Sequence, residues 1–335
     1  MGSQAYHSQI LSQPAAVARA LELTNAAALD PNRPVVFTGV GSSLHACMTA
    51  ADWIVAITDG KIRPTVIDAL ELALAGGVRP NEQLVVVSHR GNKRFTNDLI
   101  AQAAEVGAST IMVTGKKVAD PAGDVVLRTS DDDAASAHTV SYTTALAVLG
   151  KLVTTLGGSR AEELDLALKQ VPRAIQETLD LPEAGSVADR LAGVEPVLIA
   201  GSGIDAPTAE EIALKYKEST FLWAEAIGVE LALHGTPASF RPNMAGLILR
   251  PEHNDRGRAK ELGAFLRTLG APVFEVAPGE GDVPFAPVPF LARPLVSVVA
   301  LQRLVGAVAD RVSGDPDGTR ASQEPWASAI ARVNL

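Results

Sequence analysis

The sequence predicts an α/β protein with two doubly wound parallel-sheet domains in tandem, each a three-layer αβα sandwich. The chain has 335 residues, a length at which polypeptides usually divide into two domains. Short, nearly continuous apolar runs rich in β-branched residues alternate with longer helix-like segments, which is typical of βαβ units. The pattern also returns along the chain at a fixed offset, which indicates a duplicated domain.

The repeat is clearest where PVVFTGVGSS, from Pro34, matches PVLIAGSGID, from Pro196, at an offset of 162 residues. Two glycines and two further apolar runs align at this offset. They are Gly39 and Gly41 with Gly201 and Gly203, Val85–Val87 with Leu247–Leu249, and Ile111–Val113 with Val273–Glu275. A fourth run, Val125–Leu127, misses its nearest counterpart, VPF from Val288, by one residue. Three runs in register favour duplication, and the fourth is neutral.

Helix-like segments separate these predicted strands. In chain order they are residues 42–57, 94–107, 142–157, 161–181, 208–226 and 256–270. We therefore expect an N-terminal helical segment at 1–33, a first domain at 34–160, a helical bridge at 161–185, and a second domain with a C-terminal tail at 186–335. Successive parallel strands joined by helices form right-handed crossovers, which place helices on both faces of each sheet.

Polar and cationic residues follow two of the strands in the first predicted domain. Ser42 and Ser43 follow the first strand, and the stretch SHRGNK, with Ser88, Arg90 and Lys93, follows a later one. Ligands of doubly wound sheets bind beyond the carboxyl ends of the strands, where helix N-termini favour anions. These residues therefore predict a phosphate-binding site. The alternative is that the serines cap helices and the cations form a solvated edge.

Composition restricts the classes of partner. The net charge of −9 argues against general binding to nucleic acid or to anionic membranes. The single cysteine, Cys47, excludes an internal disulfide, and no signal peptide is evident at the start, so we expect a cytoplasmic protein. The six histidines are scattered, so no metal is expected. GVGSSLH lacks the third glycine of a dinucleotide-binding loop, and no cofactor is expected either.

The second half holds a group of ionisable residues within an apolar segment. Lys215 and Glu218 are three residues apart, so on a helix they share one face. A pair at this spacing is most often a surface ion pair that contributes a few tenths of a kcal/mol. His234, in LHGTP, is likewise more often a loop histidine than a catalytic one. From these residues alone, both interpretations stay open.

Several motifs, in this order, resemble the sugar isomerase (SIS) domain family, in particular the isomerase half of glucosamine-6-phosphate synthase, which has two such domains. They are QILSQPAAV, GSSLHA, SHRGNK, YTTALAVL, ALKYKESTFLWAEA and HGTP. The resemblance covers nearly the whole chain. It implies that Ser42, Ser43, Ser88, Arg90 and Lys93 bind a substrate phosphate.

The resemblance also implies roles in the second half. Glu218 moves a proton between carbons one and two, Lys215 positions the sugar hydroxyls, and His234 opens the sugar ring, often from the partner subunit of a homodimer. Several details differ from the family pattern, among them the following. Arg90 and Lys93 replace a serine and a threonine of the phosphate loop, and the glutamate that usually stands three residues before the histidine is one position earlier, at Glu230.

The predicted function is a stand-alone phosphosugar aldose–ketose isomerase, or an amino-sugar-phosphate deaminase or isomerase that uses the same proton transfer. A glutaminase domain is not expected, because no N-terminal cysteine nucleophile is present. The alternative is a sugar-phosphate-binding sensor without catalysis. Such a sensor would keep the phosphate loops and lose Glu218 or His234, whereas this sequence has both residues.

Overall fold

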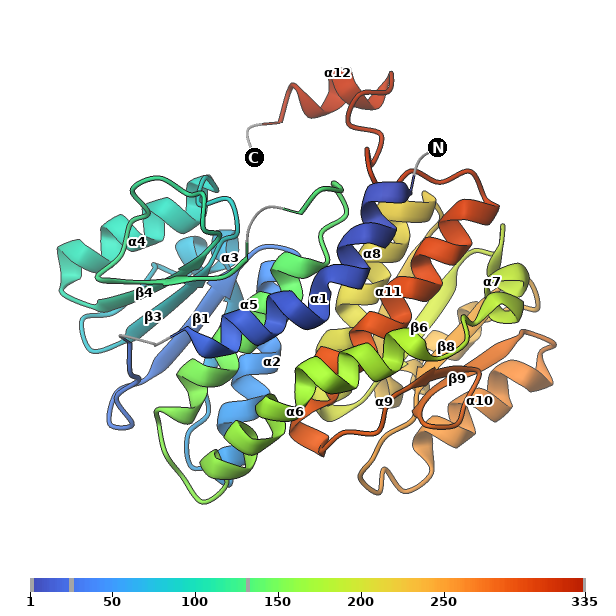
Figure 1. The fold of residues 1–335 in the computed structure, drawn as a ribbon, viewed down its shortest axis with the longest axis horizontal. Coiled ribbons are helices and arrows are strands. Elements are labelled where there is room, and N and C mark those ends of the chain that lie inside the picture. Colours follow the sequence, from blue (N-terminus) through green and yellow to red (C-terminus); the bar gives the residue numbers. More distant parts are fainter. Residues whose placement is uncertain (1–2, 24–26, 131–132, 334–335) are drawn as a thin grey trace. The chain divides into compact units, whose positions relative to one another are not determined.

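The computed structural model describes residues 3–23, 27–130 and 133–333, and Figure 1 shows its ribbon. Within these residues the chain forms two five-stranded, all-parallel sheets. It divides into two compact units. We call residues 13–133 and 140–172 the first unit, and residues 3–12, 134–139 and 173–333 the second unit, counting only described residues. The predicted α/β class is confirmed, whereas the tandem arrangement and the domain boundaries stay predictions.

The first unit contains the sheet of order β2-β1-β3-β4-β5. Its strands are β1 (Val35–Gly39), β2 (Thr65–Asp68), β3 (Gln83–Val87), β4 (Ser109–Thr114) and β5 (Val125–Arg128). Its helices are α2 (Ser42–Ile57), α3 (Ala69–Leu74), α4 (Arg94–Val106) and α5 (Val140–Thr154). Helix α1 (Gln4–Glu22) and helix α6 (Ala161–Asp180) each contribute residues to both units.

Helices cover both faces of this sheet, which explains why β1 and β3 are buried along their whole length. Alternate residues Val36, Leu84 and Val86 pack with α3 and α4 in one core. Helices α2 and α5 pack against each other, and α2 also contacts β1. The result is a three-layer αβα arrangement.

The second unit contains the sheet of order β7-β6-β8-β9-β10. Its strands are β6 (Val197–Gly201), β7 (Ala224–Gly228), β8 (Ala245–Leu249), β9 (Val273–Pro278) and β10 (Val283–Phe285). Its helices are α7 (Gly185–Leu191), α8 (Ala206–Thr220), α9 (Val229–Ala232), α10 (Arg258–Thr268), α11 (Arg293–Arg311) and α12 (Trp326–Ile330), with the 3₁₀ turns η1 (Gly203–Asp205), η2 (Thr236–Ser239) and η3 (Phe290–Ala292). The strand order repeats that of the first unit, and β6 and β8 begin 162 residues after β1 and β3.

One expectation about the second unit is wrong. The predicted helix 208–226 ends at Thr220, because Phe221 adopts a left-handed conformation (φ 62°), and the chain then forms β7. The run at Val288, which the repeat left neutral, is not a strand, and β10 lies at Val283–Phe285. The two prolines near Val288 lack the N–H groups that a strand ladder needs.

The segment Phe290–Arg311 is long and apolar enough to cross a membrane by length and composition. However, 94% of its most apolar window is buried inside the fold, where α11 packs against α7 and α8. We therefore interpret α11 as a core helix of the second unit.

Candidate functional site

The loop from Ser88 to Lys93 joins the carboxyl end of β3 to α4. It begins with a tight turn in which the Gly91 N–H donates to the Ser88 carbonyl over 3.1 Å. Gly91 has φ of 64°, and a Cβ there would lie 2.5 Å from Val118 Cγ1, so the turn requires glycine. The Thr114 hydroxyl also donates to the Ser88 carbonyl, over 2.8 Å, and fixes the start of the loop.

The Ser88 side chain is the strongest sign of a ligand site in the first unit. Its residue is only 3% exposed, and its Oγ has no hydrogen-bond partner among the described residues. An unpaired buried hydroxyl destabilises the fold, so such groups usually have a reason to persist. Ser88 lies at the carboxyl end of β3, where a ligand would bind.

Two helix N-termini lie at the same edge of the sheet. The register pairs Thr38 of β1 with Val86 of β3, so the loops that follow these strands are neighbours. Helix α2 begins at Ser42 and α4 at Arg94, and neither has a side-chain cap at its N-terminus. Uncapped first-turn N–H groups favour anions. Since β2 and β3 flank β1 on opposite sides, this edge is also the topological switch point of the sheet.

The predicted phosphate-binding residues therefore share one edge of the first unit's sheet. Ser42 and Ser43 form the first turn of α2, and Lys93 directly precedes α4. Arg90 is exposed, and Lys93 is half-buried. The arrangement is chemically suited to an anion, and the roles of these residues stay predictions.

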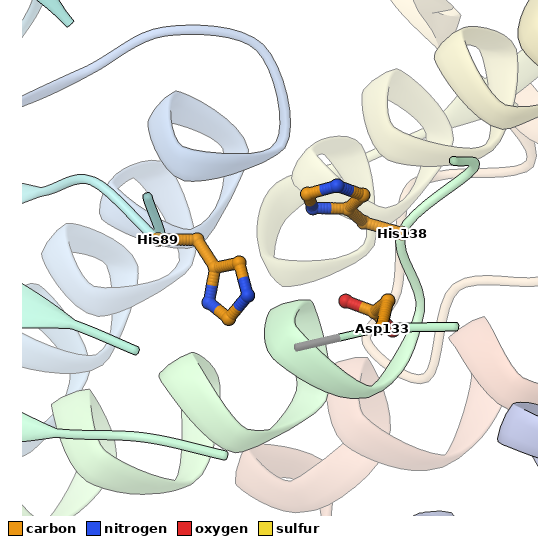
Figure 2. A group of neighbouring side chains, drawn as sticks. All are labelled: His89, Asp133 and His138. Atoms are coloured by element: carbon orange, nitrogen blue, oxygen red, sulfur yellow. The ribbon is translucent and has the colours of Figure 1, made fainter. Parts of the chain in front are cut away.

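His89, inside the same loop, lies near the carboxylate of Asp133, and Figure 2 shows both side chains. Each offers a metal-ligand atom, and these atoms lie within 4.8 Å of each other. Asp133 also accepts from the Val140 and Ser141 N–H groups, over 2.8 and 3.2 Å, and so caps α5. His138, the third residue drawn, lies in segment 134–139 of the second unit. The first unit alone thus offers two ligand groups, fewer than a closed metal site requires.

In the second unit, helix α8 carries a buried ammonium between two carboxylates. Lys215 is 1% exposed, and its Nζ lies 2.5 Å from Glu218 Oε2 and 3.7 Å from Glu211 Oε1. The Glu211 residue is fully buried, whereas 31% of the Glu218 side chain is exposed. The interpretation of Lys215 and Glu218 as a surface ion pair is therefore wrong. Glu218 is the member of this group that a ligand can reach.

Glu211 was not among the residues expected from the sequence, although a signal was available. It stands four residues before Lys215 and therefore shares its helix face. The spacing of Glu211, Lys215 and Glu218 predicts a shared helix face, but it does not predict that this face is buried.

His234 lies at the opposite edge of the sheet from Glu218. Helix α8 runs back from the carboxyl end of β6, and just after it the Trp223 carbonyl accepts from the Val197 N–H at the start of β6, over 3.0 Å. Glu218 is therefore near the amino edge. His234 follows the short helix α9, six residues after Gly228, which pairs with Gly201 at the carboxyl end of β6. The structure brings Lys215 and Glu218 together, but it does not bring His234 of the same chain to them.

His234 instead pairs with Glu230, four residues earlier. The distance from His234 Nε2 to Glu230 Oε1 is 2.7 Å. Arg258, at the start of α10, donates to both oxygens of the same carboxylate, over 2.6 and 3.1 Å. Arg258 and His234 together lower the pKa of Glu230 to about 2. Glu230 thus holds the His234 ring from four residues earlier in the sequence, rather than from the three residues of the usual pattern.

The carboxyl edge of the second unit's sheet differs from that of the first. Asp205, which directly precedes α8, and Arg293, the first residue of α11, are both buried and form a two-pronged ion pair with distances of 3.2 and 2.9 Å. Arg293 also donates to the Arg250 carbonyl at the end of β8, over 2.8 Å. An internal ion pair therefore fills the position at which the first unit has uncapped helices and a buried serine.

Comparison with known proteins identifies an SIS domain at residues 29–155, which includes most of the first unit. The chain is 28% identical over 280 residues to glutamine–fructose-6-phosphate aminotransferase [isomerizing] of Halobacterium salinarum, which covers 78% of this chain and 46% of that protein. It is 30% identical over 249 residues to the enzyme of the same name from Neisseria meningitidis serogroup B, with 69% and 40% covered. The chain thus spans less than half the length of these relatives.

Solved structures show the same fold at low identity. The C-terminal domain of glucosamine-fructose-6-phosphate aminotransferase from Francisella tularensis matches with a TM-score of 0.84 and 19% identity, over 93% of this chain and 98% of that one. Glucosamine-6-phosphate deaminase from Thermotoga maritima matches with a TM-score of 0.74 and 20% identity, over 94% and 97%. Tagatose-6-phosphate ketose/aldose isomerase from Escherichia coli gives 0.75 and 16%, over 96% and 97%.

Proposed function

Since residues 29–155 form an SIS domain, we propose that this chain is a phosphosugar aldose–ketose isomerase, or an amino-sugar-phosphate deaminase or isomerase that uses the same chemistry. The observation that carries this proposal is the buried Lys215 beside the partly exposed Glu218. A chain that only bound sugar phosphates would have no need to hold an ammonium at 1% exposure against two carboxylates. Solved structures with the same fold are named as a glucosamine-6-phosphate deaminase and a ketose/aldose isomerase, and both reactions are therefore included in the proposal.

Glu218 is proposed as the base. It removes the proton from carbon two of an open-chain aldose phosphate, and the electron pair of that C–H bond moves to form an enediol as the carbonyl oxygen gains a proton. Glu218 then returns the proton to carbon one while the carbon-two hydroxyl loses its proton and becomes the ketose carbonyl, which balances the proton taken up by the first carbonyl oxygen. A carboxylate that is partly exposed and fixed by a neighbour can meet a substrate at hydrogen-bond distance. Lys215 is proposed to hold Glu218 in place beside the substrate.

The phosphate is proposed to bind to Ser42, Ser43, Ser88, Arg90 and Lys93. The unpaired Ser88 hydroxyl and the uncapped first turns of α2 and α4 support this assignment. Arg90 and Lys93 add positive charge to a chain with a net charge of −9, so the attraction is local. No metal and no cofactor are needed for this proton transfer.

His234 is proposed to open the sugar ring from the partner subunit of a homodimer. Two observations support this. His234 lies at the opposite sheet edge from Glu218 of its own chain, and its side chain is 67% exposed while Glu230 orients the ring. A histidine held in this way is available to a second copy related by twofold symmetry.

Deuterium exchange tests the proton transfer. We would incubate the protein in heavy water with hexose 6-phosphates and hexosamine 6-phosphates and follow the carbon-two proton by NMR. Wild type should exchange this proton, Glu218→Gln should not, and Glu210→Gln, a change on the same helix away from the ion pair, should behave as wild type. Binding without exchange in all three proteins would refute catalysis and leave the sugar-phosphate sensor.

Subunit mixing tests the role of His234. His234→Ala and Glu218→Gln should each be inactive, and an equal mixture should regain about a quarter of wild-type activity, because half of the dimers are hybrids with one intact site. No recovery after unfolding and refolding the mixture together would mean that His234 acts within its own chain, or does not act. A monomer in the analytical ultracentrifuge would contradict the homodimer directly.

Ammonia release separates the two reaction types. A deaminase converts an amino-sugar phosphate and water into a ketose phosphate and ammonia, whereas an isomerase releases nothing. We also propose a cytoplasmic location. The free thiol of Cys47 is buried, and burial raises its pKa, so it is an inert structural group that suits a reducing compartment.

A further inference from the structure

We propose that the second unit has a separate binding site for a small organic anion, in a pocket between α10 and strands β8 and β9. The pocket has a volume of about 520 Å³, within the range of small-molecule sites. It shares none of its lining residues with the proposed phosphate loop, with Lys215 and Glu218, or with His234. The inference therefore goes beyond the proposed function and does not depend on it.

The floor of the pocket is apolar and is kept open by a glycine. Ile248 and Val273 come from neighbouring strands, and Gly263 lies in the middle of α10. A Cβ on Gly263 would lie 3.5 Å from Ile248 Cδ1 and 3.7 Å from Val273 Cγ1, so any larger residue would fill the floor. Glycine inside a helix lowers stability relative to alanine, which makes its presence here informative.

Two cations at the rim have no acidic partner. Lys260 and Arg267 both line the pocket, and within the part of the chain that the structure describes neither forms an ion pair or a hydrogen bond through its side chain. The Arg267 guanidinium does not extend away from the helix. Its Nη1 lies 3.1 Å from the position of a Gly263 Cβ, so it folds back over the pocket floor.

The acids that line the pocket are already engaged. Asp255 accepts from the Gly257 and Ala259 N–H groups, over 2.9 and 2.7 Å, and so caps α10. Glu275 pairs with Arg250 over 3.0 Å. The lining holds three cations, Arg250, Lys260 and Arg267, against the two carboxylates of Asp255 and Glu275, so the pocket is positive in a chain whose net charge is negative. An anion would neutralise this charge.

The ligand class follows from these features. An apolar floor under two cations suits a molecule that joins a phosphate or carboxylate to a planar or aliphatic group. The pocket extends from the loop after β8, where Arg250 and Asp255 lie, along the side of α10. The anion in the second unit would bind along the side of α10, at Lys260 and Arg267, which are about two helical turns apart.

Calorimetric titration at low salt tests the site. The probes are adenosine 5′-monophosphate for the phosphate class and 3-phenylpropionate for the carboxylate class, with adenosine as the uncharged control. We expect one probe to bind once per chain. The double variant Lys260→Gln, Arg267→Gln should bind it at least about tenfold more weakly, since two charge contacts are lost. Adenosine should bind much more weakly than the monophosphate.

Three further comparisons complete the test. Lys169→Gln with Arg173→Gln removes the same charge from α6 and should bind as wild type, whereas Gly263→Ala should weaken binding without lowering the urea midpoint. Arg90→Ala with Lys93→Ala should also leave binding within about twofold. Loss of binding in that last variant but not in the pocket variant would assign the probe to the phosphate loop and overturn the proposal. Absence of binding by both anions at millimolar concentration would overturn it too.

Discussion

Replacement of Lys215 by methionine would test whether the α8 ion group is structural as well as functional. Methionine has a similar length but no charge, so the change removes only the ammonium. It leaves the Glu211 carboxylate fully buried, 3.7 Å from the site of the lost charge, and frees Glu218, which keeps its access to water. The cost should therefore come mainly from Glu211.

The magnitude follows from distance and burial. Opposite charges about 4 Å apart attract by about 4 kcal/mol at the effective dielectric constant that suits protein sites. Removing one partner of a buried pair typically costs about 3–5 kcal/mol, because the remaining charge is desolvated without compensation. We expect Lys215→Met to lower the free energy of unfolding by this amount. Glu218→Gln should cost about 1 kcal/mol or less, because Glu218 is partly exposed and Lys215 keeps Glu211.

Urea denaturation followed by circular dichroism measures both changes. The decisive comparison is the double variant Lys215→Met, Glu211→Gln, in which no buried charge remains from this pair. It should be at least about 2 kcal/mol more stable than the sum of the single changes predicts. If Lys215→Met is within about 1 kcal/mol of wild type, or if the two changes are strictly additive, the Lys215 ammonium does not offset the cost of burying the Glu211 carboxylate.

Three further predictions address other parts of the chain. Burial raises the pKa of Asp52 from 3.8 to about 6. The stability that the protonated Asp52 contributes is therefore complete below pH 3.8 and is lost as the pH rises through 6. By urea denaturation, Asp52→Asn should be roughly 3 kcal/mol more stable than wild type at pH 7 and equal to it at pH 3.5. A Cβ on Gly314 would lie 2.2 Å from the Ser219 carbonyl oxygen, so Gly314→Ala should lower the unfolding free energy by about 1–3 kcal/mol, measured in the same way. The Arg320 guanidinium lies 4.1 Å from the centre of the Trp326 ring and 4.0 Å from the centre of the Phe221 ring. Because Arg320→Ala removes both cation–π contacts, it should speed chymotrypsin cleavage after Trp326 without changing the global urea midpoint.

Each of these predictions has a matched control. Asp98→Asn changes an exposed acid and should show no gain at pH 7. Gly228→Ala adds a Cβ with nothing within 4 Å and should change stability by less than about 0.5 kcal/mol. Arg332→Ala, in the same tail, should leave chymotrypsin cleavage unaltered. If a control shifts as much as its partner, the structural reason given for that partner is wrong.

The parts of the fold that could be predicted from sequence are those with the strongest burial. The four runs that became β1, β3, β6 and β8 are buried at every position, so they are continuously apolar and easily recognised. Strand β7 was missed because it is half-exposed and includes Glu225, which reads as part of a helix. The helix before it ends at a left-handed Phe221, a position where sequence offers no glycine as a signal.

The candidate site was predicted only where its contacts are local. The spacing of Lys215 and Glu218 identified a pair, because residues three apart on a helix face each other. The support that Arg258 gives to Glu230 could not be predicted, since the two residues are 28 positions apart in sequence and meet only in the folded unit. Tertiary contacts of this kind decide how the histidine is oriented, and spacing does not contain them.

The two units share a strand order but differ in the residues at the switch point, and this difference supports the proposed division of roles. At the offset of the repeat, Ser43 of the first unit corresponds to Asp205 of the second. A phosphate at that point would meet the Asp205 carboxylate, and the carboxylate already holds the buried Arg293. Changing Asp205 to serine would not create a phosphate site, because Arg293 would lose its partner and the unit would be destabilised. This supports the proposal that the second unit serves the reaction through α8 and that the first unit, with the buried hydroxyl of Ser88, binds the substrate phosphate.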